Sequence, residues 1–427
     1  MSNTKSIGGA AVAGYFCVAS MPVLAGGLGL LEIGTSDLGL AGAGYAARAQ
    51  DAATAFTNPA GMTRIKGNDL VLGAQLLYGD ETFSPNGGTA VQGNDGGNDL
   101  GFIPGGGVFY VHSVSNDVKL GIAMAGNFGL GLKWDDGWVG RYFAQEGTLL
   151  GMNIMPSVAF RATDKLSLAV GANAMYAYIN AKAKINNAPL GGATGDGEVT
   201  YKDFEWGFGG TLGVLYELSP QTRFGATYSS RIKLDFAAQP QFSNLGNIGT
   251  VLQNAGLIGA QLQLGMKVPQ MVMTSAYHEL NDEWAVMGNL GWQEWSKFGS
   301  FEVNVASTTP TSLTTQSDYK NTWHTALGAQ YEYSDQWQLS GGIGYDSEVN
   351  DGPRSSLVAP LGSFTSLGLG AKYKVRNGYD VSFGYTLRYY PDLQIDQAGP
   401  AGIMQPRVVG EYKNPMLHFF GATFHWN

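Results

Sequence analysis

Histidine, cysteine and serine are the side chains that most often carry catalysis, and their spacing in this 427-residue sequence predicts no catalytic centre. The five histidines, at positions 112, 278, 324, 418 and 425, are scattered, and no Gly-x-Ser-x-Gly motif, Cys/His metal spacing or phosphate loop is present. The only cysteine, Cys17, lies in the first 25 residues, so we expect no mature disulfide and no Cys-based metal site. A lipase would need a Ser/His constellation, which scattered residues neither show nor exclude. We therefore expect no enzymatic activity, no cofactor and no metal.

The composition is typical of strands that turn one face to lipid. The chain has 63 glycines and 12% aromatic residues, while 14% of its residues are charged, against roughly 25% in soluble domains. Its mean hydropathy of -0.07 is too low for a helical membrane protein. The net charge of -9 argues against a nucleic-acid partner, which calls for a basic face.

The N-terminus has the pattern of a secretory signal. Lys5 precedes an uncharged run over residues 6–24, and Val23-Leu24-Ala25 forms a small-residue cleavage site before Gly26. The alternative is a transmembrane anchor, but glycine and alanine make this run weakly apolar for a span of ~20 residues. A second uncharged run, residues 236–266, holds too much Gln, Asn and Gly for a spanning helix. We therefore predict a signal peptide over residues 1–25 and membrane insertion by strands.

Short polar turns and long loops alternate along the chain. Six short turns lie at residues 113–117, 163–164, 219–221, 281–282, 334–335 and 376–378. Seven long stretches lie at residues 79–99, 133–148, 185–199, 239–260, 305–314, 348–361 and 391–408. Together they imply fourteen strands with short turns on one rim and long loops on the other, which is the pattern of an outer-membrane barrel.

The strands alternate between apolar and polar residues. In residues 379–389, Tyr379 and Phe383 fall on one face, and Asp380 and Arg388 fall on the other. Aromatic residues cluster beside the short turns, as in a membrane girdle. Soluble β proteins can also be rich in aromatics, but they are not expected to alternate loop lengths so regularly. The sequence predicts an all-β fold, a transmembrane antiparallel β-barrel of about fourteen strands over residues 68–427, in the bacterial outer membrane.

Residues 26–67 differ from the rest of the chain. They are rich in Gly and Ala, and Pro59 cannot sit in a central strand because it has no N–H to donate. We predict that this segment is a helical or irregular hatch that plugs the barrel lumen. Within it, Asn58, Pro59 and Ala60 form either a tight turn that caps a helix or the hinge by which the hatch loosens.

An apolar stripe lies in the fourth long loop. The spacing of its members by three and four residues suits one face of a helix, and exposed apolar patches usually bind something. The stripe could instead pack on the third loop or on the barrel mouth. Trp134 and Trp138, in the second long loop, line the same groove or the outer girdle. The stripe consists of Leu245, Ile248, Val251, Leu252, Ala255 and Ile258.

These features resemble the FadL/TodX family of outer-membrane transporters for long-chain fatty acids and other hydrophobic compounds. The resemblance covers nearly the whole mature chain, and no single motif decides it. Its most specific segments are Asn58-Pro59-Ala60-Gly61-Met62, Gly140-Arg141-Tyr142, and residues 156–160, 164–167 and 327–331.

The resemblance implies a kinked third strand with a lateral exit. Here that strand is residues 118–132, with Asn127, Phe128 and Gly129 as the expected kink, since glycines weaken the ladder and permit a bulge. The alternative is that these glycines make room for the hatch. The family also holds carboxylates with basic lumen residues through charge-assisted hydrogen bonds. Lys182 and Lys184 share one face of a strand and are candidates, although lysines beside loops are usually solvated.

The expected function is passive uptake of hydrophobic molecules, either long-chain fatty acids or aromatic or aliphatic hydrocarbons, across the outer membrane. The resemblance implies capture on outer loops, a lumen pocket gated by the hatch, and lateral exit from a monomer that contacts outer-membrane lipid and lipopolysaccharide. The main alternative is a general porin for small polar solutes, with an open lumen and trimer contacts. A third interpretation is an adhesin or structural barrel with polar outer loops.

Overall fold

The computed structural model describes residues 29–427 except 32, 193, 299, 307–310, 317–318, 353, 376–377 and 400–401. The predicted signal peptide and the first three residues of the predicted hatch lie outside the described residues, as do parts of the predicted loop at 305–314 and the predicted turn at 376–378.

Fourteen antiparallel strands in the described chain form one closed ring, which confirms the predicted barrel. The ring closes where the first strand pairs with the last, from Leu70 opposite Trp426 to Asp80 opposite Met416. In chain order the strands are β1 (Asp69–Asp80), β3 (Gly101–Ser113), β4 (Val118–Lys133), β5 (Glu146–Arg161), β6 (Leu166–Ile185), β7 (Gly197–Glu217), β8 (Thr222–Ser229), β12 (Met271–Glu279), β13 (Trp284–Gln293), β16 (Thr322–Glu332), β17 (Trp337–Asp346), β18 (Phe364–Val375), β19 (Tyr379–Tyr389) and β22 (Met416–Trp426).

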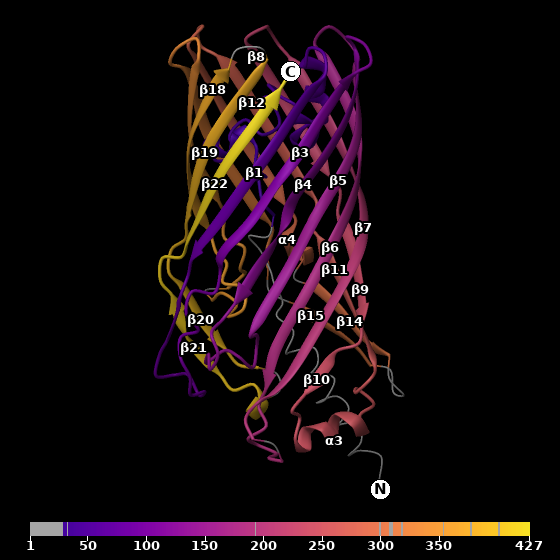
Figure 1. Cartoon of the computed structure of the whole chain (residues 1–427), viewed down its shortest axis with the longest axis vertical. Coiled ribbons are helices and arrows are strands. Elements are labelled where there is room, and N and C mark those ends of the chain that lie inside the picture. The colour runs from indigo at the N-terminus through magenta and orange to yellow at the C-terminus, as the bar shows by residue number, and fades with distance from the viewer. Residues whose placement is uncertain are drawn as a thin grey trace.

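The long loops carry further structure at the end opposite the C-terminus (Figure 1). One four-stranded sheet continues the wall beyond β8, β12, β13 and β16, and one three-stranded sheet is formed by the loops that join β1 to β3 and β19 to β22. The first consists of β9 (Ile232–Ala238), β11 (Gln261–Val268), β14 (Ser300–Ala306) and β15 (Thr311–Gln316). The second consists of β2 (Phe83–Pro85), β20 (Leu393–Gln397) and β21 (Val408–Tyr412). The remaining loop elements are β10 (Gln241–Ser243), α3 (Asn247–Asn254), α4 (Trp295–Phe298) and η3 (Gly402–Met404).

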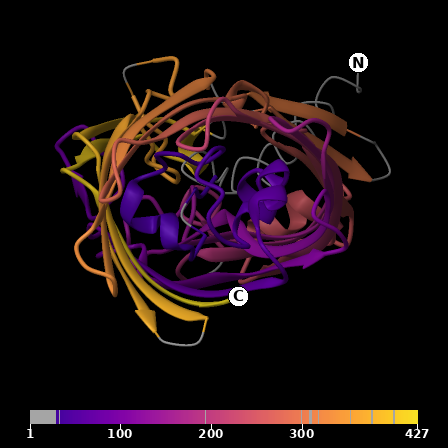
Figure 2. The same ribbon diagram turned by 90° about the horizontal axis from the view of Figure 1, so that it is seen from above.

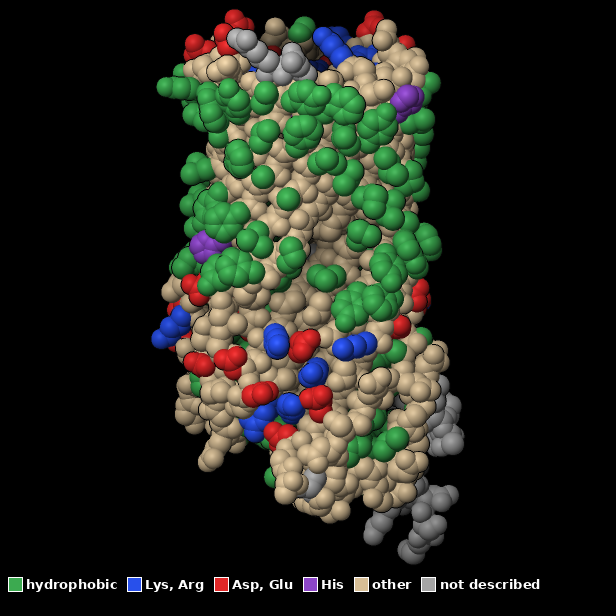
Figure 3. Space-filling model, viewed as in Figure 1, with side chains coloured by type: hydrophobic (Ala, Val, Ile, Leu, Met, Phe, Trp, Pro, Cys, Tyr) green, Lys and Arg blue, Asp and Glu red, His purple; other side chains and the backbone are tan. Residues whose placement is uncertain are grey.

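The outer face of the barrel is a broad apolar band bordered by charged side chains (Figure 3). Along β19, Phe383 and Tyr389 are exposed while Ser382, Thr386 and Arg388 are buried, so alternate residues face outward and inward. Rings such as those of Trp284 and Tyr331, with centroids 4.5 Å apart, stack beside the short turns. This arrangement matches a lipid-facing wall with an aromatic girdle. Among the described residues, no helix is both long and apolar enough to cross a membrane.

Residues 29–65 lie inside the ring (Figure 2). Their short helices are η1 (Ser36–Leu40), α2 (Thr54–Thr57) and η2 (Pro59–Arg64). Glycines in the wall let the backbone of this segment touch the strands: a Cβ on Gly225 would come 1.8 Å from the carbonyl oxygen of Ala46. Hydrogen bonds fix the contact, with the Ala46 N–H donating to Ser275 Oγ over 2.9 Å and the Ala52 N–H donating to Asp69 Oδ1 over 2.7 Å. The lumen is therefore occupied, as the hatch prediction requires.

Candidate functional site

Asn58 ties the hatch together and also ties it to the wall. Its Oδ1 accepts from the N–H of Ala60 at 3.2 Å, which caps η2, and Pro59 follows at the first helical position, where its missing N–H is harmless. Its Nδ2 donates to the carbonyl oxygens of Ala46 at 2.7 Å and of Val214 in β7 at 2.9 Å. The sequence indicated the cap, while the bond to β7 depends on long-range packing. A hinge role for this turn stays a prediction.

Arg48 of the hatch is paired within the hatch, whereas Arg64 pairs with Glu217 of β7. Arg48 is buried between Asp37 and Asp51, and its Nη2 lies 2.9 Å from Asp51 Oδ2. The carbonyl oxygen of Ala47 accepts from Nε of Arg223 in β8 at 2.7 Å, and that guanidinium lies 3.6 Å from the ring centroid of Tyr277. Arg223 is therefore a candidate for holding the hatch against the wall. The sequence did not indicate this role, because an arginine beside a short turn has the pattern of a solvated residue.

The ladder between β3 and β4 is incomplete. β1 pairs with β3 as far as Gly101, but β3 pairs with β4 only up to Gly107 opposite Ala125. β4 continues to pair with β5 on its other side as far as Lys133. Past Ala125, β3 and β4 therefore make no ladder contacts with each other, although the Ile103 side chain still reaches to 3.7 Å from where a Cβ on Gly131 would lie. We call this break in the hydrogen-bonded wall the gap.

A bulge lies at the same level as this gap. The register of β4 against β5 shifts between Gly126 and Phe128, which leaves Asn127 as the extra residue. Gly129 follows with φ of 150°, and a Cβ there would come 2.5 Å from the carbonyl oxygen of Leu149. The bulge thus coincides with the three residues at which the kink was predicted.

The start of the described chain lies against the bulge. The N–H of Leu30 donates to the carbonyl oxygen of Asn127 at 2.9 Å, and Gly29 forms an isolated antiparallel bridge with Phe128. Phe128 is buried and meets the ring of Phe298 edge-on at 5.9 Å. Backbone contacts therefore anchor the start of the described chain to the bulge of β4.

A cavity of about 70 Å³ adjoins these elements. It is bounded by residues 29–31, by Tyr45 and Phe56 of the hatch, by Asn127 and Phe128 at the bulge, and by inward-facing residues of the wall. The described residues that line it include no Lys, Arg, His, Asp or Glu. Within the described chain, no group of three or more His, Cys, Asp or Glu side chains could hold a metal ion. The cavity is suited to binding an apolar molecule.

The comparisons with known proteins agree with this architecture. The family described as "Outer membrane protein transport protein (OMPP1/FadL/TodX)" matches residues 16–426. The chain belongs to this family. It is accordingly an outer-membrane transport protein and not an enzyme.

Curated members of the family are similar over most of their length. Outer membrane protein P1 of Haemophilus influenzae is 27% identical over 399 residues, which cover 83% of this chain and 84% of the relative. The long-chain fatty acid transport protein of Salmonella typhi is 26% identical over 424 residues, which cover 93% of this chain and 94% of the relative.

Solved structures share the fold. A FadL homologue of Pseudomonas aeruginosa superposes with a TM-score of 0.84 at 19% identity, covering 94% of this chain and 99% of that one. The toluene transporter TbuX of Ralstonia pickettii gives a TM-score of 0.66 at 18% identity, covering 94% of this chain and 100% of that one.

The outer-loop stripe of this FadL/TodX-family chain is only partly exposed. Ile248 and Leu252 of α3 are buried and Leu245 packs against the same core, whereas Val251 is 41% and Ile258 is 37% exposed. Two of the predicted groove residues in α3 and its flank therefore remain available for capture.

Trp134 and Trp138 do not line an open groove. Their rings stack in parallel at 4.1 Å and both are buried in the core of the loops, which corrects the expectation for them. Two carboxyls, Glu81 and Asp99, are buried in the same region, and Asp99 interacts with Trp134 and Tyr412. Burial raises the pKa of Glu81, with a further increase from Asp99, and burial also raises the pKa of Asp99.

Lys182 and Lys184 lie on the outer face of β6. They alternate with Asn173 and Met175, which line the cavity, and share the face of Val170, which is exposed. Lys184 Nζ lies 2.7 Å from the carboxylate of Glu198, and Lys182 Nζ lies 3.9 Å from the same carboxylate. The expectation that these lysines bind a ligand carboxylate in the lumen is therefore not supported, because strand alternation turns them away from it.

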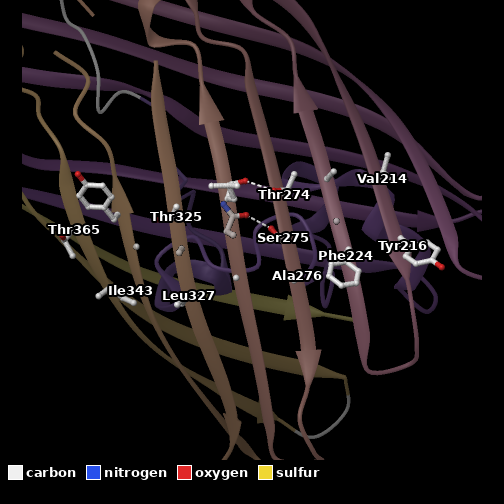
Figure 4. A pocket seen from close by; sticks show the side chains of 18 residues that line it. Val214, Tyr216, Phe224, Thr274, Ser275, Ala276, Thr325, Leu327, Ile343 and Thr365 are labelled. Atoms are coloured by element: carbon white, nitrogen blue, oxygen red, sulfur yellow. Dashed lines mark hydrogen bonds between the residues drawn. The ribbon is translucent and has the colours of Figure 1, made fainter. Parts of the chain in front are cut away.

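A large hollow lies on the outside of the wall (Figure 4). It measures about 980 Å³ and crosses strands from β7 to β18. Its lining includes the large outward-facing side chains of Phe224, Leu327 and Ile343. It also includes the smaller side chains of Ala276 and Thr325. The hydroxyl of Thr274 donates to the carbonyl oxygen of Leu290 at 3.0 Å. The hollow belongs to the lipid-facing surface and adds nothing to the lumen site.

Proposed function

We propose that this chain moves hydrophobic molecules across the outer membrane passively. Outer loops capture the molecule, the cavity beside the hatch holds it, and the gap between β3 and β4 releases it sideways. The observation that carries the proposal is the early end of the β3–β4 ladder at Gly107 and Ala125, directly beside the bulge that borders the cavity. Relatives named for transport of long-chain fatty acids and of toluene support the same class of cargo.

The contacts of the hatch favour this transporter over a general porin. A porin needs a water-filled lumen, whereas here the hatch backbone donates to Ser275 and Asp69 of the wall, and the Asn58 side chain donates to the carbonyl oxygen of Val214. These contacts fill part of the lumen with hatch, which does not suit free passage of polar solutes. The concentration gradient of the cargo supplies the driving force.

The cavity must enlarge when cargo binds. Its 70 Å³ is below the roughly 150 Å³ of an engineered apolar cavity that admits benzene. Residues 29–31 form one side of the cavity and are held at Asn127 by a single backbone hydrogen bond together with the Gly29–Phe128 bridge. Their displacement makes room for cargo and at the same time uncovers the gap.

We further propose how the chain is divided into segments and what surrounds it in the membrane. Residues 1–25 act as the signal peptide, residues 26–67 as the hatch and residues 68–427 as the barrel. The protein works as a monomer whose apolar band contacts lipid. The Lys182–Lys184–Glu198 cluster on the outer wall faces lipopolysaccharide.

The test is a pair of measurements on the purified barrel in detergent and in planar bilayers. Saturable binding of a long-chain lipid or an alkylbenzene, with low ion conductance, is the expected result. Free ion conductance with no binding of either probe would establish a porin instead.

A further inference from the structure

The cavity beside the hatch contains polar groups but no charge. Its described lining combines apolar surfaces such as Phe56, Met155 and Met175 with the amides of Asn153 and Asn173. A carboxylate placed here has no counter-ion, and an unpaired charge is far more costly to bury than a neutral polar group.

The polar groups of the lining form one chain of hydrogen bonds. Asn153 Nδ2 donates to Asn173 Oδ1 at 3.1 Å, and Asn173 Nδ2 donates to Thr211 Oγ1 at 2.8 Å. The hydroxyl of Thr211 lies 3.2 Å from that of Ser229. The chain ends at Asn153 Oδ1, which is buried and has no hydrogen-bond partner among the described residues.

The unpaired group at the end of this chain is neutral whichever way the amides point. Amide oxygen and nitrogen are assigned from the network, and reversal of the whole chain presents an N–H₂ group in place of the oxygen. A ligand hydroxyl satisfies either arrangement, because it both donates and accepts. Asn127 Oδ1, on the opposite border of the cavity, is likewise buried without a partner in the described structure.

Two arginines beside the cavity are engaged with other groups. Arg231, next to the lining residue Ser230, places its Nη2 2.5 Å from the carboxylate of Glu294. Arg388 lies in an adjoining cavity of about 30 Å³ whose lining also includes Asp346. Its guanidinium packs over two aromatic rings at 4.6 and 5.0 Å from their centroids.

We infer that the cargo of this chain is an uncharged hydrophobic molecule, either a hydrocarbon or a long-chain alcohol, and not a fatty-acid anion. The inference rests on the proposed function and names the substrate class of its pocket. The cavity selects against carboxylates by offering them no cation, and it selects for a hydroxyl through the open end of the amide chain.

The test compares two ligands with the same chain, palmityl alcohol and palmitate, on the purified full barrel at about pH 8, where the carboxylate is ionised. Binding is followed by tryptophan fluorescence, which Trp295 in the cavity lining makes sensitive. We expect the alcohol to bind at least about tenfold more tightly than the anion. Palmitate binding as tight as that of the alcohol overturns the inference and leaves the proposed function standing. If neither ligand nor an alkylbenzene binds, the proposed function fails as well.

Two variants of one residue sharpen the comparison. Asn153→Lys places an ammonium at the open end of the amide chain and is expected to strengthen palmitate binding by about tenfold. Asn153→Leu, of similar size, is expected to weaken binding of the alcohol by about threefold to tenfold. Binding of an alkylbenzene should be unchanged. Heat-modifiable migration on gels checks that each barrel folds.

A third variant tests the neighbouring arginine directly. Arg388→Gln is expected to leave the ratio of the two affinities unchanged. Loss of a tight palmitate interaction in this variant would place the headgroup at Arg388 and overturn the inference.

Discussion

The backbone N–H of Leu30 donates to the carbonyl oxygen of Asn127 over 2.9 Å, which joins the start of the described hatch to the bulged residue of β4. Both residues border the cavity. A cargo molecule that enlarges the cavity by moving residues 29–31 must break this bond. Binding of cargo in the cavity and release of residues 29–31 from the bulge beside the gap are therefore thermodynamically linked. The link follows from one hydrogen bond and needs no long-range signal.

The Asn58 turn is expected to hold the hatch against the wall. Asn58→Ala removes an acceptor from Ala60 and two donor bonds to Ala46 and Val214. Because buried partners are left unpaired, we expect a loss of about 1–3 kcal/mol in hatch stability. Hydrogen exchange of residues 36–65 measures it. Asn68→Ala, which removes only an exposed bond to the N–H of Ser113, is the control and should behave as the parent protein does. Equal exchange in both variants would contradict this role.

Wall glycines are expected to set how closely the hatch fits. Gly225→Ala puts a methyl group 1.8 Å from the carbonyl oxygen of Ala46, so the hatch or the wall must move. We expect ion leakage in planar bilayers and a stability loss of about 1–3 kcal/mol. Gly210→Ala is the matched control, since its new methyl meets nothing closer than 3.6 Å. Leakage from the control alone, or from neither variant, would show that the fit is not decisive.

The outer loops are expected to loosen as the pH rises. Burial raises the pKa of Glu81 and Asp99 above their ordinary values, so both carboxyls stay protonated in the folded loop after they would ionise in the unfolded one. Their stabilising contribution is complete below about pH 4, the ordinary carboxyl range, and is lost as the pH passes through the raised values. Protease protection of residues 81–99 should fall as the pH rises above about 4. Asp99→Asn should flatten the profile, and protection that rises with pH would refute the assignment.

Capture by the outer loops is expected to depend on the exposed members of the apolar stripe. Val251→Ser removes apolar surface from the exposed side of α3 without touching the cavity. We expect the association rate of an alkylbenzene to fall a few-fold, with the final affinity within about twofold of the parent, because the holding site is unchanged. Gln253→Ser, in the same helix, is the control for stopped-flow fluorescence. An affinity loss without a rate change would place Val251 in a holding site.

Local patterns were enough to predict the barrel and most of the hatch. Period-two alternation and turn chemistry are properties of neighbouring residues, so the fourteen strands could be counted from the turns. Pro59 marked the non-strand segment, and the glycines around Asn127 marked the bulge.

Features that depend on distant contacts could not be predicted in this way. Alternation shows that Lys182 and Lys184 share a face, but only the closed ring shows that this face is the outer one. The burial of Trp134 and Trp138 depends on loops far away in sequence, as does the proximity of the Glu81 and Asp99 carboxyls. β8 ends at Ser229, and the chain enters the separate sheet at Ile232. The residues across this break resemble ordinary strand sequence, so the break could not be predicted.

Lateral release through the gap is the central claim, and deletion of Asn127 tests it most directly. Gly126 pairs with Met152 and Phe128 with Gly151, so removal of the residue between them restores a continuous ladder and straightens β4. Asn127→Ala keeps the bulge and serves as the control. The measurement is cellular uptake of a radiolabelled hydrophobic cargo, alongside binding to the purified barrels. We expect the deletion to reduce uptake at least about tenfold relative to Asn127→Ala while the purified barrel still binds cargo saturably, because a continuous wall blocks release even where cargo can still be held. Uptake by the deletion variant at the rate of the control would contradict lateral release.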